Sequence, residues 1–160
     1  MSDHLSHFDP EGKAIMVDVG EKPPTRRTAV ARGAVRMRPE TLRRILDRSV
    51  EKGDVFAVAR LAGIMAAKQT ATLIPLCHHL PISSAEITFT PAVEQSEVNI
   101  EARVRVTDRT GVEMEALTAV AIAALTIYDM CKAIDREMVI TEVKLVEKSG
   151  GKSGEFLRNT

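Results

Sequence analysis

The chain has 160 residues, a formal net charge of zero and a hydrophobic content of 44%, which suits one domain with one core. Zero net charge excludes attraction of the whole molecule to nucleic acid or to an anionic membrane, so any anion site must be local. No run of eighteen apolar residues and no cationic start before an apolar stretch occurs. We therefore expect neither a membrane span nor a secretory signal, and a cytoplasmic location.

The N-terminal residues are polar and rich in turn formers. We expect a mobile segment at 1–14, a single folded domain at 15–156 and a short tail at 157–160. Residues 16–19 are predicted to form a short edge strand. The stretch 28–37, rich in Val and Ala, is predicted to form a longer strand.

Two helices are predicted next. Pro39 opens the first helix, and its apolar face is formed by Leu42, Ile45 and Leu46. Lys52-Gly53-Asp54 ends it, and Asp54 can cap a second helix that runs from Val55 to about Thr70. The following stretch, 73–81, contains two prolines and is predicted to be a loop.

Two strands are indicated by strict alternation of apolar and polar residues, at 85–90 and at 98–106. They are predicted to form a hairpin with one solvated face, and 139–146 is predicted to be the final strand. The order of elements indicates an α+β protein. We expect a ferredoxin-like sandwich, in which helices cover one face of an antiparallel four-stranded sheet.

A long helix is predicted between the hairpin and the final strand, at 110–132. Thr110 and Glu113 have the spacing of a capping box, and the residues from 119 to 125 are apolar on every face. This helix is expected to pack on the sheet and, on its other side, on another helix or another subunit. Asp129 and Lys132 share one face at its end.

The length of this helix limits what its two ends can do together. Glu115 and Asp129 are fourteen residues apart, which corresponds to roughly 20 Å along a helix. They cannot both contact one reacting atom. If both ends are functional, either the ligand is long or the site joins one end to another subunit.

Basic residues form the first candidate site: Arg27, Lys52, Lys132, Lys148 and Lys152. Three of these lysines lie beside glycines, where ammonium and backbone N–H groups together could hold a polyphosphate. For a single lysine, a solvated surface charge is the simpler interpretation. For Lys132, a role in proton transfer has equal weight, because Asp129 adjoins it.

Carboxylates and a Cys-His-His run form the second candidate site. Glu113 and Glu115 can accept the adjacent N–H donors of a guanine-like ring, although the capping box alone could account for Glu113. Three consecutive residues, Cys77, His78 and His79, do not easily converge on one metal ion, so no metal site is predicted. Two alternatives remain for the histidines: one imidazole takes part in hydrogen bonding or acid–base chemistry, or the histidines have no role in the loop.

These candidates fall within a series of longer motifs. The motifs are KGDVF at 52–56, AGIMAAK at 62–68, LIPLCH at 73–78, TGVEMEALT at 110–118, IYDMCK at 127–132 and KSGGKSG at 148–154. Together they resemble the MoaC family, the cyclic pyranopterin monophosphate synthases of molybdenum cofactor biosynthesis. The resemblance extends from Met16 to Phe156. His79 stands where the family commonly has proline, so the resemblance assigns it no role.

The resemblance implies a lyase that acts on (8S)-3',8-cyclo-7,8-dihydroguanosine 5'-triphosphate. The product is cyclic pyranopterin monophosphate, and diphosphate is released. It implies that Asp129 and Lys132, helped by Lys52, carry out the proton transfers. The implied substrate-binding residues are Leu76, Cys77, His78, Glu113, Met114, Glu115, Lys148, Arg27 and Lys152.

The resemblance also implies a homohexamer, a trimer of dimers with sites at the subunit interfaces. The sequence requires no cofactor and contains no carboxylate cage, and Mg²⁺ bound to the triphosphate is compatible with it. From the residues alone, two functions compete. One is an enzyme acting on a nucleotide or another phosphorylated metabolite, and the other is a ligand-binding regulatory module. Every motif position of the family is present, which argues against an inactive paralogue.

Overall fold

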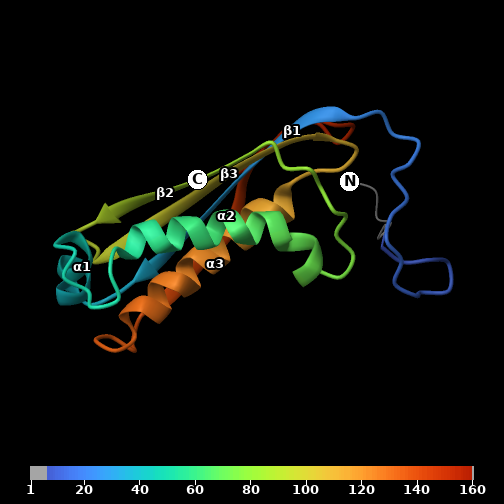
Figure 1. The fold of residues 1–160 in the computed structure, drawn as a ribbon. Coiled ribbons are helices and arrows are strands. Elements are labelled where there is room, and N and C mark those ends of the chain that lie inside the picture. Colours follow the sequence, from blue (N-terminus) through green and yellow to red (C-terminus); the bar gives the residue numbers. More distant parts are fainter. Residues whose placement is uncertain (1–6, 160) are drawn as a thin grey trace.

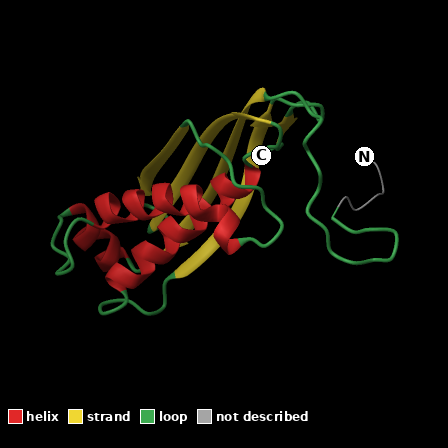
Figure 2. Cartoon of the chain, turned by 45° about the vertical axis from the view of Figure 1, so that its right-hand side comes forward, coloured by secondary structure: helices red, strands yellow, loops and turns green. Residues whose placement is uncertain are grey.

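An antiparallel sheet with helices packed on one face makes up the computed structural model, which describes residues 7–159 (Figures 1 and 2). Within these residues the strands are β1 (Thr25–Arg36), β2 (Ser84–Ala92), β3 (Glu97–Asp108), β4 (Val139–Ser149) and β5 (Phe156–Leu157). The helices are α1 (Pro39–Leu46), α2 (Val55–Leu73) and α3 (Glu113–Cys131). The strand order is β2-β3-β1-β4-β5, and every neighbouring pair is antiparallel. The predicted α+β class is confirmed.

The sheet has five strands in the described part of the chain, so the predicted number of four is wrong. The additional strand, β5, pairs Phe156 with Lys148 and Leu157 with Glu147 at the edge of β4. Two residues are too few to produce a detectable alternation, so the sequence pattern contained no signal for it.

The two faces of the sheet differ as the alternation predicts. On β3, Val98, Ile100 and Val104 are buried on the helix side. On the other side, charges on β1 and β3 face each other across the strands, with Arg32 bound to Glu101 at 2.7 Å. Such cross-strand pairs keep one face solvated while the other packs on the helices.

The N-terminal region contains no strand at 16–19, so that prediction is wrong. These residues have no regular secondary structure and do not join the sheet. The carbonyl of Val17 instead accepts a hydrogen bond from His78 Nε2 at 2.7 Å. Of the segment predicted to be mobile, residues 1–6 lie outside the described residues, and 7–14 form a small loop closed by a β-bridge between Phe8 and Ala14.

The first two helices begin where the sequence predicts. Pro39 occupies the first turn of α1, and Asp54 caps α2 by accepting a hydrogen bond from the Ala57 N–H at 3.0 Å. Of the predicted apolar face of α1, Leu42 and Ile45 are buried, whereas Leu46 is 44% exposed.

The predicted capping box of α3 is wrong. The N-cap residue is Val112, and no side chain caps the helix there. Thr110 lies two residues before that position, so its hydroxyl is not where a cap must be. The Glu113 carboxylate lies 3.2 Å from the Lys148 ammonium on β4. The tertiary ion pair therefore replaces the local motif.

α3 forms the centre of the core. Its buried apolar residues are Ala116, Ala119, Val120, Ala123, Ala124, Ile127, Met130 and Cys131. A Cβ at Gly33 of β1 would lie 2.8 Å from Val120, and one at Gly63 of α2 would lie 3.1 Å from the Ala119 carbonyl. The two glycines thus let α3 approach both neighbours, which confirms its predicted packing on a sheet and on another helix. α3 is long and apolar enough to cross a membrane, but this burial identifies it as a core helix.

Asp135 fixes the turn that follows α3. Its buried carboxylate accepts hydrogen bonds from the Arg38 N–H (2.9 Å), the Thr41 hydroxyl (3.0 Å) and the Glu137 N–H (3.1 Å). Burial alone would raise the pKa of Asp135, but these hydrogen bonds and the Arg38 charge outweigh it and lower the pKa below 3.8. The carboxylate thereby ties α1 to the C-terminal end of α3.

We predict that Asp135→Ala lowers the free energy of unfolding at pH 7 by about 2–4 kcal/mol, because the buried Thr41 hydroxyl and two part-buried backbone N–H groups lose their acceptor. The lowered pKa means that the parent loses this stabilisation as the pH falls below about 4. Urea denaturation at pH 7 and at pH 3 measures both effects. Asp47→Ala, at an exposed position, is the control and should change little. Equal losses for the two variants would contradict the role of Asp135.

Candidate active site

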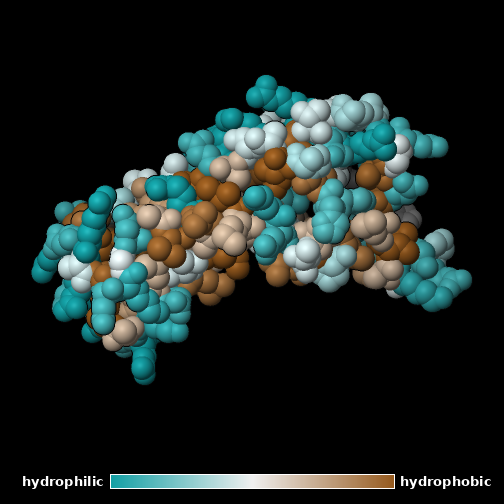
Figure 3. Space-filling view, viewed as in Figure 1, coloured by the Kyte–Doolittle hydropathy of each residue, from teal (hydrophilic) through white to brown (hydrophobic). Residues whose placement is uncertain are grey.

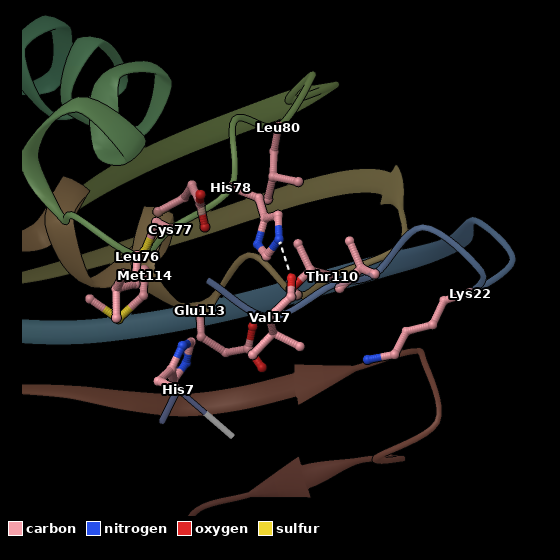
Figure 4. Close-up of a pocket in the computed structure, with 13 residues that line it drawn as sticks. His7, Val17, Lys22, Leu76, Cys77, His78, Leu80, Thr110, Glu113 and Met114 are labelled. Carbon is pink, nitrogen blue, oxygen red and sulfur yellow. Dashed lines mark hydrogen bonds between the residues drawn. The ribbon is translucent and has the colours of Figure 1, made fainter. Parts of the chain in front are cut away.

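A pocket of about 360 Å³ lies at the N-terminal end of α3 (Figure 4). It is lined by three stretches of chain, at 7–22, 76–80 and 110–115. Six of the predicted substrate-binding residues line it: Leu76, Cys77, His78, Glu113, Met114 and Glu115. The fold thus brings together the loop after α2 and the start of α3, as a shared binding role requires.

Glu115 forms a buried acid in this pocket, with 4% of its surface exposed. Burial raises the pKa of Glu115 to about 7; its own backbone hydrogen bond opposes this shift, and the nearby Glu113 charge adds to it. Burial, followed by the Glu115 charge, raises the pKa of the Cys77 thiol. At neutral pH the pocket therefore contains a thiol and a carboxyl group that readily exchanges its proton.

Three of the predicted cations lie at the same end of α3. Lys148 Nζ is 3.2 Å from Glu113 and 2.5 Å from the Ser153 hydroxyl. Arg27 donates hydrogen bonds to the carbonyls of Asp108 and Arg109 at 2.9 and 3.0 Å. A side chain at Gly151 would collide with the Arg27 guanidinium, so the glycine turn that carries the exposed Lys152 folds over Arg27.

A second cluster lies at the C-terminal end of α3. The Asp129 carboxylate is 2.7 Å from Lys132 Nζ and 3.0 Å from Lys52 Nζ, and Lys52 also donates to the Asp129 carbonyl at 2.9 Å. Hydrogen bonds from Lys132 and then from Lys52 lower the pKa of Asp129. The three predicted catalytic residues thus form one exposed cluster beside a hollow lined by Tyr128 and Arg136.

The two clusters do not meet within one chain. Lys52 is bound at Asp129 and Lys148 at Glu113, sixteen residues apart on one helix, which corresponds to more than 20 Å. The glycine-flanked lysines therefore do not form a single cation site in one chain. The predicted substrate-binding and catalytic residues also remain on separate ends.

The structure adds residues that sequence reasoning missed. His7, Val17, Val19 and Lys22 line the pocket from the N-terminal segment. The charge-rich loop around Lys22 was a detectable signal, whereas the apolar residues before it had no pattern that links them to a site. In residues 7–159, no group of three His, Cys, Asp or Glu side chains is placed to hold a metal ion.

The fold and these two clusters define an α+β protein with a buried acid–thiol pocket and a Lys–Asp–Lys cluster at opposite ends of one core helix. The chain belongs to the MoaC family, whose model matches residues 16–151.

Three relatives show how close this similarity is. Over 154 residues, the chain is 66% identical to the cyclic pyranopterin monophosphate synthase of Pelotomaculum thermopropionicum, covering 96% of this chain and 91% of the relative. Proteins of the same name from Magnetococcus marinus and Heliobacterium modesticaldum are 62% and 60% identical over 156 residues. These alignments cover 98% of this chain and 96% and 98% of those relatives.

We predict that the stability of the parent falls relative to Glu115→Gln as the pH rises from about 4.5 to about 7. In that window the folded protein retains the Glu115 proton, whereas the unfolded chain has released it, so deprotonation favours unfolding. The expected fall is on the order of 3 kcal/mol. Chemical denaturation of both proteins across this range measures the difference. A constant difference from pH 4 to pH 8 would show that the Glu115 pKa is not raised.

Proposed function

We propose that this chain is a cyclic pyranopterin monophosphate synthase that acts in molybdenum cofactor biosynthesis. Its substrate is the cyclised dihydroguanosine triphosphate, which it rearranges to the cyclic pyranopterin monophosphate with release of diphosphate. One observation carries the proposal: in a chain 66% identical to a protein of that name, one carboxylate is bound by two ammoniums. That arrangement suits a rearrangement driven by proton transfers.

The Lys–Asp–Lys cluster supplies the proton chemistry in this proposal. Asp129 is ionised at neutral pH, because both lysines stabilise its charge. It holds the Lys52 and Lys132 ammoniums together at the end of α3, where each can donate a proton to the opening purine-derived ring. The exposure of the cluster leaves it accessible to a ligand presented from outside the chain.

The pocket at the other end of α3 binds the substrate in this proposal. The Glu113 and Glu115 carboxyl groups suit the adjacent N–H donors of a guanine-derived ring. Lys148, Arg27 and Lys152 suit the phosphates, where cations stabilise the charge that develops on the departing diphosphate. Mg²⁺ would arrive with the triphosphate rather than in a site of its own.

We propose that a second copy of the chain completes the site. The outer surface of the helix layer exposes large apolar side chains, of which Val58, Leu61 and Met65 of α2 and Leu125 of α3 are 44–60% exposed. Figure 3 shows hydrophobic side chains gathered over these helices. Two copies related by a two-fold axis can bury this surface with their α3 helices antiparallel. The Glu115 end of one chain then adjoins the Asp129 end of the other.

Further features of the proposal follow from the family. We propose a hexamer built as a trimer of such dimers, and a cytoplasmic location. We also assign the fold as ferredoxin-like. With α1 and β5 counted as additions, the remaining elements follow the order βαββαβ of that architecture: β1, α2, β2, β3, α3 and β4.

The function is tested by measuring diphosphate release and product mass when the purified protein meets the cyclised guanosine triphosphate. We expect release by the parent and a loss of at least about a hundredfold in both variants, because Lys52→Ala removes a positioned proton donor and Asp129→Ala removes the carboxylate that positions the two ammoniums. Arg43→Ala, at an exposed position of α1 outside the family motifs, should retain activity. Binding without release by the parent would instead favour a regulatory module or an inactive paralogue.

Subunit mixing tests the shared site. Glu115→Ala and Asp129→Ala are each expected to be inactive. When the two exchange subunits freely, half of the dimers are mixed and each mixed dimer regains one intact site, so about a quarter of the parent activity should return. A mixture of Glu115→Ala with the Glu115→Ala/Asp129→Ala double variant is the control and regains none. Absence of recovery in the first mixture, with exchange verified by mass, would rule out the shared site.

A further inference from the structure

The segment at 17–22, which we name the strap, crosses the mouth of the substrate pocket. Val17, Val19 and Lys22 line the pocket, together with residues of the loop at 76–80 and the start of α3. Figure 4 shows Val17 and Lys22 beside His78 and Glu113. The strap belongs to no helix or strand. Its position is therefore set by specific hydrogen bonds and not by a sheet ladder.

One hydrogen bond anchors the strap to the loop at 76–80, and two hydrogen bonds within the strap shape its turn. His78 Nε2 lies 2.7 Å from the Val17 carbonyl, and because a carbonyl only accepts, Nε2 carries the proton. Within the strap, the Asp18 carboxylate accepts a hydrogen bond from the Gly20 N–H at 2.8 Å, and the Lys22 N–H donates to the Val19 carbonyl at 3.1 Å. These two hydrogen bonds close a tight turn that sets the direction of the Lys22 side chain.

The charge on Lys22 is uncommitted. Among residues 7–159, Lys22 forms no ion pair, whereas Lys148 pairs with Glu113 and Lys52 with Asp129. Figure 4 shows its side chain extending from the strap toward the pocket. Of the two acidic residues on the strap, Asp18 is held in the turn by the Gly20 N–H, and Glu21 is exposed. A ligand whose ring contacts the carboxyl groups of the pocket can place its anionic group beside the Lys22 ammonium at the rim.

We infer that the strap is part of the substrate site: Lys22 binds a phosphate oxygen of the triphosphate, and His78 positions the strap through the Val17 carbonyl. This inference rests on the proposed function for the identity of the ligand. It makes Lys22 a binding residue outside the motifs of the sequence analysis. It also gives His78 a positioning role, in which its imidazole acts on the strap and not on the reacting ring.

The Lys22 test uses inorganic triphosphate as the probe in titration calorimetry, and the Michaelis constant of the cyclised nucleotide as the second readout. Lys22→Ala is expected to weaken triphosphate binding and raise KM about tenfold, with kcat little changed, because one charge-assisted hydrogen bond is lost. Lys22→Arg keeps the charge and should retain most of the affinity. Lys13→Ala is the matched control, since Lys13 lies shortly before the strap and its ammonium pairs with Glu11 at 2.7 Å. Binding by Lys22→Ala equal to that of the parent would overturn the inference.

A double-mutant cycle tests the role of His78. If His78 acts through the strap, His78→Ala raises KM in the parent but adds little in the Lys22→Ala background. Additive effects would overturn the positioning role and show that His78 contacts the substrate by itself. Parent turnover separates the two proposals. If the parent releases diphosphate and Lys22→Ala binds triphosphate as tightly as the parent, only the inference about the strap is overturned. If triphosphate binding depends on Lys22 but the parent releases no diphosphate, only the proposed function is overturned.

Discussion

The burial of one uncharged helix is the constraint on which the rest of this structure depends. α3 carries no charged side chain between Glu115 and Asp129, and its middle packs against β1 and β3 of the sheet and against α2. Gly33 and Gly63 allow that close contact, because a side chain at either position would meet α3. A helix buried along this length is rigid, so the charged residues at its two ends are kept at a fixed separation.

The two ends place chemically similar carboxyl groups in opposite states. Glu115 is withdrawn from water beside Glu113, and its pKa is raised to about 7. Asp129 remains exposed between two ammoniums, and its pKa is lowered. The same functional group can therefore exchange a proton near neutral pH at one end and stay ionised at the other. A site that used both ends would combine binding by the first with proton transfer by the second.

Local patterns predicted the elements well where the local interaction is also the one that the fold uses. Asp54 caps α2 as expected, and the alternation of β2 and β3 corresponds to one buried and one solvated face. The prediction failed where a tertiary partner was available. Glu113 pairs with Lys148 instead of capping its own helix, and residues 16–19 bond to His78 instead of to a strand. Neither partner is near in sequence, so no periodicity could reveal it.

The sequence by itself determined the α+β class, the long apolar helix and the separation of Glu115 from Asp129, and it supplied candidate residues for both ends of that helix, because spacing and motif order are local properties of the chain. Only the tertiary structure decided which of those residues meet. It placed Lys52 on Asp129 across 77 positions, gathered the loop at 76–80 and the start of α3 around one pocket, and laid the strap with Lys22 over its mouth. These contacts join segments that are distant in sequence, and chain packing alone brings such segments together.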